Sequence, residues 1–173
     1  SGAAGVLSGL PQGDGALSIT AKTRQEIEDF LIDYTTAIDD GALDRWPDFF
    51  GDPCLYKIVA KENYDSGLPL ALLLCDSPGM IQDRCDAFAK LNVFGPRTWR
   101  HMTGSVRLTE DGGAIKARSN FVIFETLAGK DTHVLCAGEY CDVIVREAKS
   151  LKFRERLCIY DTTMIPNSIV MPL

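Results

Sequence analysis

The second half of the chain consists of extended segments that follow one another with short links. Its alternating and apolar positions predict four strands, at residues 99–109, 114–126, 133–145 and 151–162. The links Asp111-Gly112-Gly113 and Ala128-Gly129-Lys130 have the length and the residue types of antiparallel hairpins. The second half is therefore expected to form one curved sheet, which the first half must cover.

The first half is predicted to supply three helices that cover this sheet. A capping box at Thr23-Arg24-Gln25-Glu26 begins the first helix, which ends at Asp39-Asp40-Gly41. Residues 43–50 form a short second helix, whose Trp46 we expect to be part of an aromatic lid on the core. Ser77-Pro78 begins the third helix. Helices gathered on one face of an antiparallel sheet define an α+β fold.

Length and composition limit the domain count and the class of partner. A chain of 173 residues fits one domain, expected over residues 20–173 after a flexible Gly/Ala-rich arm at residues 1–19. Within this domain we also expect a strand at residues 54–61 and a loop at residues 63–69. The net charge of -6, without a basic cluster, makes nucleic acid and anionic membranes poor partners. No apolar run approaches the roughly 20 residues that span a bilayer. The six scattered cysteines are expected to be reduced core thiols of a cytoplasmic protein.

The sequence contains no recognisable set of residues for catalysis or for holding a metal or cofactor. His101 and His133 are the two histidines, and neither has the spacing of a metal-ligand motif. We expect His101 to be a hydrogen-bonded structural residue and His133 to be solvated. No C-x-x-C, phosphate-loop or G-x-S-x-G motif is present. We therefore assign no catalytic, cofactor-binding or metal-binding residue to this chain.

One carboxylate lies at an unusual position. Glu139 shares a face of its predicted strand with apolar side chains, and such surroundings raise the pKa of a carboxyl toward the range of a general acid or base. The favoured interpretation is a salt bridge to Arg118 or Arg156 on a neighbouring strand, because buried charges are rarely unpaired.

The last predicted strand has two distinct faces. Strict alternation places Leu151, Phe153, Leu157 and Ile159 on the core face. The opposite face then carries Lys152, Arg154, Arg156 and Tyr160. Lys116 and Arg118 share a face of the second strand of the meander, so we expect a basic sheet face directed away from the helices. That face is either solvated or an interface between subunits.

Several motifs, taken in their order along the chain, are similar to one known family. They lie at residues 39–50, 62–68, 80–84, 97–101, 118–121, 137–140 and 153–162 and in the Met-Pro-Leu end. Together they resemble the small (β) subunit of bacterial aromatic-ring-hydroxylating dioxygenases, over about residues 23–173. The resemblance is greatest to the branch that acts on aromatic acids such as terephthalate, salicylate or anthranilate.

This resemblance implies a cone-shaped fold of the nuclear transport factor 2 or cystatin-like type, with three helices on a curved antiparallel sheet. In that family the large (α) subunit holds a Rieske [2Fe–2S] cluster and a mononuclear iron and receives electrons from NADH through a reductase. The small subunit is mainly structural, and three copies of it form a trimer within a hetero-hexamer. The resemblance thus places every cofactor in a partner.

The leading hypothesis is a non-catalytic oxygenase subunit in aromatic-acid degradation. The alternatives are a stand-alone enzyme of the ketosteroid-isomerase or polyketide-cyclase type, using Glu139, Tyr56 or His101, and a small-molecule binding module. Under the leading hypothesis the apolar tail at residues 169–173 docks on a partner, and deleting residues 171–173 weakens assembly without disturbing the fold. The candidate interface or structural residues are Trp46, Arg118, Glu139, Lys152, Arg154, Arg156, Met171 and Leu173.

Overall fold

A computed structural model describes residues 19–90, 96–162 and 171–173. Its centre is a seven-stranded sheet in the order β2-β1-β7-β6-β5-β3, with β4 also paired to β5. The strands are β1 (Phe50–Ala60), β2 (Leu73–Cys75), β3 (Arg97–Thr103), β4 (Arg107–Asp111), β5 (Ala114–Leu127), β6 (His133–Glu147) and β7 (Ser150–Tyr160). The pair β1–β7 is parallel and the other pairs are antiparallel, so the sheet is mixed rather than antiparallel throughout.

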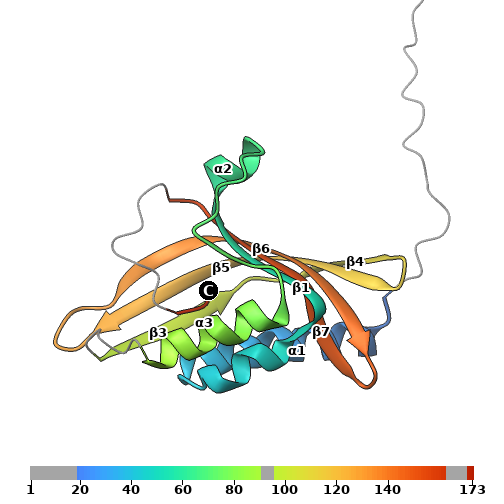
Figure 1. Cartoon of the computed structure of the whole chain (residues 1–173), viewed down its shortest axis with the longest axis horizontal. Helices are drawn as coiled ribbons and strands as arrows, with labels where there is room; N and C mark the ends of the chain where they lie inside the picture. The colour runs from blue at the N-terminus through green and yellow to red at the C-terminus, as the bar shows by residue number, and fades with distance from the viewer. Residues whose placement is uncertain (1–18, 91–95, 163–170) are drawn as a thin grey trace, which may run out of the picture.

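The helices lie mostly on one side of this sheet. Figure 1 shows α1 and α3 packed below the curved sheet, while the short α2 projects from the opposite side. The bounds are α1 (Ala21–Asp39), the 3-10 helix η1 (Leu43–Phe49), α2 (Lys61–Asp65) and α3 (Pro78–Lys90). This arrangement confirms the α+β class, and we call the space between the sheet and the two longer helices the interior.

The first helix begins earlier than the capping box predicts. Its N-cap is Thr20, whose hydroxyl accepts a hydrogen bond from the backbone N–H of Thr23 at 3.1 Å. The Thr23 hydroxyl lies 2.9 Å from the Thr20 hydroxyl and so belongs to the first turn instead of preceding it. Thr20 and Thr23 are both residue types that cap helix N-termini, and the upstream one, Thr20, is the N-cap here.

Two predicted segments are also more divided than expected. The strand predicted at residues 99–109 is interrupted, because residues 104–106 lie opposite only two residues of β5 between the pairs Thr103↔Phe121 and Arg107↔Arg118. The backbone N–H of Gly104 donates to Asn120 at 2.8 Å, which keeps the bend attached to the sheet. An extra residue of this kind bends a strand and increases its twist. The loop expected at residues 63–69 is partly helix α2, and β2 lies in a run for which no strand was predicted.

The aromatic side chains of α1, η1 and β1 form the centre of the core. Tyr34 meets the rings of Phe49 and Phe153 edge-on at centroid distances of 5.4 and 5.3 Å. Trp46 packs against Phe50 and Tyr56 at 5.5 and 5.1 Å. Edge-to-face packing at these distances is favourable beyond the area it buries. Trp46 is only 1 % exposed, so the indole of the predicted lid is part of the core and is not available as an interface residue.

A register shift in the last strand reverses which of its side chains face the interior. Phe153 pairs with Ile144 and Glu155 pairs with Val143, so Arg154 is an extra residue on β7 with no opposite partner on β6. Because side chains alternate along a strand, the extra residue brings Arg156 to the same side as Phe153. The strict alternation predicted for residues 151–160 is therefore wrong beyond Arg154, and Arg156 is buried in the core.

Candidate functional site

The interior contains a fully buried ion pair between neighbouring strands. Arg156 Nη1 donates to Asp142 Oδ2 at 2.8 Å, and the two side chains are 1 % and 2 % exposed. The guanidinium carbon also lies 3.8 Å from the ring centroid of Tyr140 and 4.2 Å from that of Tyr34. Burial raises the pKa of the Asp142 carboxyl to about 6, and the Arg156 guanidinium opposes a larger rise. This cluster joins the two strands β6 and β7 to α1.

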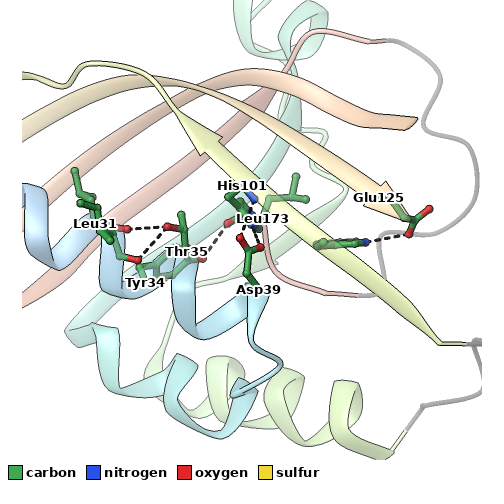
Figure 2. Close-up of polar contacts among 9 residues, drawn as sticks. Leu31, Tyr34, Thr35, Asp39, His101, Glu125 and Leu173 are labelled. Carbon is green, nitrogen blue, oxygen red and sulfur yellow. Dashed lines mark hydrogen bonds and ion pairs between the residues drawn. The ribbon is translucent and has the colours of Figure 1, made fainter. Parts of the chain in front are cut away.

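The end of the described chain occupies the middle of the interior. Leu173 is fully buried, and its main-chain oxygen accepts a hydrogen bond from Tyr34 Oη at 2.9 Å (Figure 2). Its backbone N–H donates to Tyr56 Oη at 2.8 Å. The Trp46 indole N–H donates to Tyr34 Oη at 3.1 Å and so orients the donor. The prediction that the core does not depend on residues 171–173 is wrong, because Leu173 is part of that core.

A histidine–carboxylate pair links the end of α1 to β3. Asp39, at the end of α1, accepts from the backbone N–H of His101 at 2.9 Å, and its other oxygen lies 2.6 Å from His101 Nδ1 (Figure 2). The His101 side chain is fully buried, and its Nε2 atom has no hydrogen-bond partner among the described residues. The pair ties α1 to β3, which confirms that His101 is a hydrogen-bonded structural residue.

A second buried carboxylate, that of Glu125, links β5 to β3. Glu125 on β5 accepts from Trp99 Nε1 at 2.9 Å and from Arg97 Nη1 at 3.0 Å. His133 Nε2 lies 3.4 Å from the other Glu125 oxygen, and its side chain is 45 % exposed. His133 is thus a largely solvated residue at the rim of this cluster, as expected for a turn position.

The outer face of the sheet, opposite the helices, carries paired charges. Arg118 donates to Glu139 across the β5–β6 pair, and the arginine side chain is 66 % exposed. Lys116 pairs with Asp111 at 2.6 Å at the β4–β5 turn. The hydrogen bond from Arg118 lowers the pKa of Glu139, so the interpretation of this carboxyl as an acid with a raised pKa is wrong. Its predicted partner Arg118 is confirmed, whereas Arg156 pairs with Asp142 instead.

The eight predicted interface or structural residues fall into separate environments. Arg154 is exposed, Met171 is half-buried, and Lys152 Nζ donates to the main-chain oxygen of Asp48. Trp46, Arg156 and Leu173 are inside the core, and Arg118 and Glu139 pair on the outer face. The three residues weighed for acid–base catalysis do not converge either, since Tyr56 contacts the tail, His101 contacts Asp39 and Glu139 faces outward.

An exposed apolar row follows α2. Alternate residues Leu68, Leu70, Leu72 and Leu74 are 46 %, 60 %, 50 % and 45 % exposed, and we call them the leucine row. The row runs from the end of α2 back to the edge of the sheet, where Leu74 lies in β2. A contiguous set of half-exposed leucines is typical of an interaction surface. The period of two in this segment is the signal that could have predicted it.

Space for a small molecule remains on one side of the interior. A cavity of about 510 Å³ lies between α1 and the bend joining β3 to β4, with Ser119, Tyr140 and Arg156 at its wall. The Tyr140 hydroxyl has no hydrogen-bond partner among the described residues. Within those same residues no group of three or more His, Cys, Asp or Glu side chains could hold a metal ion. Their helices include none that is long and apolar enough to cross a membrane.

Comparison with known proteins assigns the chain to a domain class and to a family of relatives. Residues 20–157 match the SnoaL-like domain, which is the class that the fold defines. The chain is 33 % identical over 141 residues to the anthranilate 1,2-dioxygenase small subunit of Burkholderia cepacia, covering 81 % of this chain and 88 % of that protein. It is 29 % identical to a terephthalate 1,2-dioxygenase terminal oxygenase β subunit of a Comamonas species, over 86 % of this chain and 97 % of that one.

A solved structure supports the same assignment. A protein described as the β subunit of an aromatic-ring-hydroxylating dioxygenase from Novosphingobium aromaticivorans superposes with a TM-score of 0.80 at 35 % identity, over 88 % of this chain and 97 % of that one. The chain therefore belongs to the family of small (β) subunits of aromatic-ring-hydroxylating dioxygenases. The family resemblance predicted from the motifs is confirmed.

Proposed function

We propose that this chain is the structural subunit of a Rieske non-haem iron oxygenase that hydroxylates an aromatic carboxylic acid. The relatives named above are subunits of an anthranilate and a terephthalate 1,2-dioxygenase, and both compounds are aromatic carboxylates. The Rieske [2Fe–2S] cluster, the mononuclear iron and the electrons from NADH belong, in this proposal, to the large subunit and its reductase. Three copies of each subunit form a hetero-hexamer in the cytoplasm.

The proposal rests on Leu173, which occupies the centre of the interior and leaves the cavity beside α1 as a separate space. A stand-alone enzyme built on this cone needs an open pocket with converging acid and base groups. Here Leu173 occupies the middle of the interior, and its main chain engages the phenol groups of Tyr34 and Tyr56. The buried Arg156–Asp142 pair is held by rings and contributes to structure. These contacts favour a scaffold over a catalyst.

Two exposed surfaces suit two kinds of neighbour. We assign the leucine row to the contact with the large subunit. Its four half-exposed leucines form an apolar surface that is unfavourable in water unless another protein covers it. We assign the outer sheet face around Arg154 to the other small subunits, since a charged and ion-paired face suits a symmetric contact between copies.

Co-purification tests this proposal. The affinity-tagged chain, co-expressed with the large-subunit gene from the same source, is expected to recover a partner that carries iron and acid-labile sulfide. The double variant Leu70→Asp/Leu72→Asp should lose the large subunit while keeping its own circular dichroism spectrum. As a matched control, Met80→Asp/Met102→Asp changes two apolar side chains of α3 and β3 that are exposed to a similar degree, and it should retain the large subunit. Failure of the unaltered chain to recover a large subunit would refute the proposal.

A further inference from the structure

The polar contacts around Leu173 resemble those that a protein makes to a bound peptide. Both main-chain groups of this residue are paired: the N–H with Tyr56 Oη at 2.8 Å and the oxygen with Tyr34 Oη at 2.9 Å. Tyr56 Oη also lies 3.4 Å from that oxygen, and Cys158 Sγ lies 3.6 Å from it. The two tyrosines belong to α1 and β1, more than 100 positions from Leu173, and Cys158 belongs to β7.

The groups that hold Leu173 are positioned by their own packing. Tyr34 is fixed by edge contacts to Phe49, Phe50 and Phe153 at centroid distances of 5.4, 6.5 and 5.3 Å. The indole of Trp46 donates to the Tyr34 hydroxyl, which leaves the Tyr34 proton free to point at Leu173. We call Tyr34, Tyr56 and Cys158 the cage around Leu173. Because the packing already orders these side chains, they lose little conformational entropy when a ligand binds.

The chemistry of the cage defines the ligand it accepts. Burial raises the pKa values of Tyr34 and Tyr56, so both phenols remain neutral and protonated. Two neutral phenols, one of which also accepts, match an amide-like group with one acceptor oxygen and one N–H donor. The Leu173 side chain is fully buried beside them, which adds a branched apolar group to the requirement.

We propose that the interior is a peptide-binding site that the chain's own residues Met171, Pro172 and Leu173 occupy, and that it accepts the same tripeptide from solution once these residues are removed. This inference does not rest on the oxygenase function, because it concerns the interior contacts alone. It assigns the tail the role of a ligand bound in cis, which fills a cone that would otherwise be open.

Truncation and add-back test the proposal. Removing residues 171–173 should lower the Tm by roughly 4–20 °C, the range expected when a buried leucine is lost from a domain of this size. N-acetyl-Met-Pro-Leu, added as the acid and as the amide, should then raise the Tm in proportion to the logarithm of its concentration. N-acetyl-Met-Pro-Asp is the matched control and should have no effect, because its side chain is charged.

The result that overturns the proposal is a truncated chain that stays folded, as judged by circular dichroism, and whose Tm responds to neither form of the peptide. A Tm that does not fall on truncation overturns it equally. When Tyr56→Phe is added to the truncated chain, the affinity for the peptide should fall about fivefold, because one hydrogen bond of ordinary strength is lost.

A second variant decides the matter where truncation prevents folding. Leu173→Gly keeps the full chain and its main-chain contacts but removes the isobutyl group, which leaves an apolar space beside the phenols. We expect 4-methylpentanol, which carries that branched group, to raise the Tm of Leu173→Gly and to leave the unaltered chain unchanged. An equal response of both proteins, or no response of either, would contradict a site for this side chain.

Discussion

Replacing Arg156 by methionine should destabilise the fold by about 3–5 kcal/mol at pH 8, because it leaves the Asp142 carboxylate buried without a partner. The two side chains are 1 % and 2 % exposed, so water cannot substitute for the lost guanidinium. The same change removes the guanidinium from the faces of Tyr34 and Tyr140. Free energies of unfolding from urea titrations followed by circular dichroism measure the effect.

The pH dependence of this loss follows from Asp142. Its pKa is already raised to about 6 by burial, and the guanidinium that opposes the rise is absent in Arg156→Met, so its pKa lies higher still in that variant. A carboxyl whose folded pKa exceeds its unfolded pKa stabilises the fold most when protonated, and that stability is lost as the pH rises toward the folded pKa. The variant should therefore recover about 1.4 kcal/mol relative to the unaltered chain between pH 8 and pH 7, where unaltered Asp142 remains largely ionised.

Two controls separate the buried pair from ordinary charge effects. Arg118→Met removes the same side chain from an ion pair on the outer face, where the arginine is 66 % exposed, and should leave the unfolding free energy unchanged. Arg156→Met/Asp142→Leu removes both charges and should regain most of the loss. A loss in Arg156→Met that is as small as that of Arg118→Met, or that does not vary with pH, would refute this account of the interior.

The other predictions concern the Asp39–His101 pair and the exposed surfaces. Asp39→Ala should cost about 1–3 kcal/mol in urea unfolding, because it leaves the backbone N–H and Nδ1 of His101 without an acceptor; a Tm equal to that of the unaltered chain would contradict it. Glu139→Gln should leave the Tm unchanged, since its partner is mostly exposed, and a large fall would restore a buried role for this carboxyl. Arg154→Glu should weaken self-assembly in light scattering without changing the circular dichroism spectrum, whereas assembly at full strength would remove Arg154 from the contact between copies.

Periodicity predicted the elements whose local signals agree with their packing. The apolar spacing of Ile27, Tyr34 and Ile38 identifies the buried face of α1, and all three are fully buried or nearly so. The hairpins at residues 111–113 and 128–130 were predictable because glycine supplies the positive φ angles that Gly112, Gly113 and Gly129 adopt. Such features depend on a few neighbouring residues, which a sequence shows directly.

The interior was not predictable, because it depends on contacts between distant segments. One extra residue at Arg154 reverses the direction of the side chains that follow it, and no turn-forming residue marks that position. Nothing near Leu173 in the sequence indicates that Tyr34 and Tyr56 will hold its main chain. Trp46 lies on a short helix that resembles a surface lid, and only its packing against Phe50 and Tyr56 places it in the core.

The mass of the complex tests the central claim most directly. Sedimentation equilibrium of this chain purified with the large subunit from the same source should give a mass equal to three copies of each. After dissociation, iron and acid-labile sulfide should remain with the large chain. A small chain that sediments as a monomer at micromolar concentration, both alone and in the presence of that large subunit, would contradict the assignment of this protein as an oxygenase scaffold.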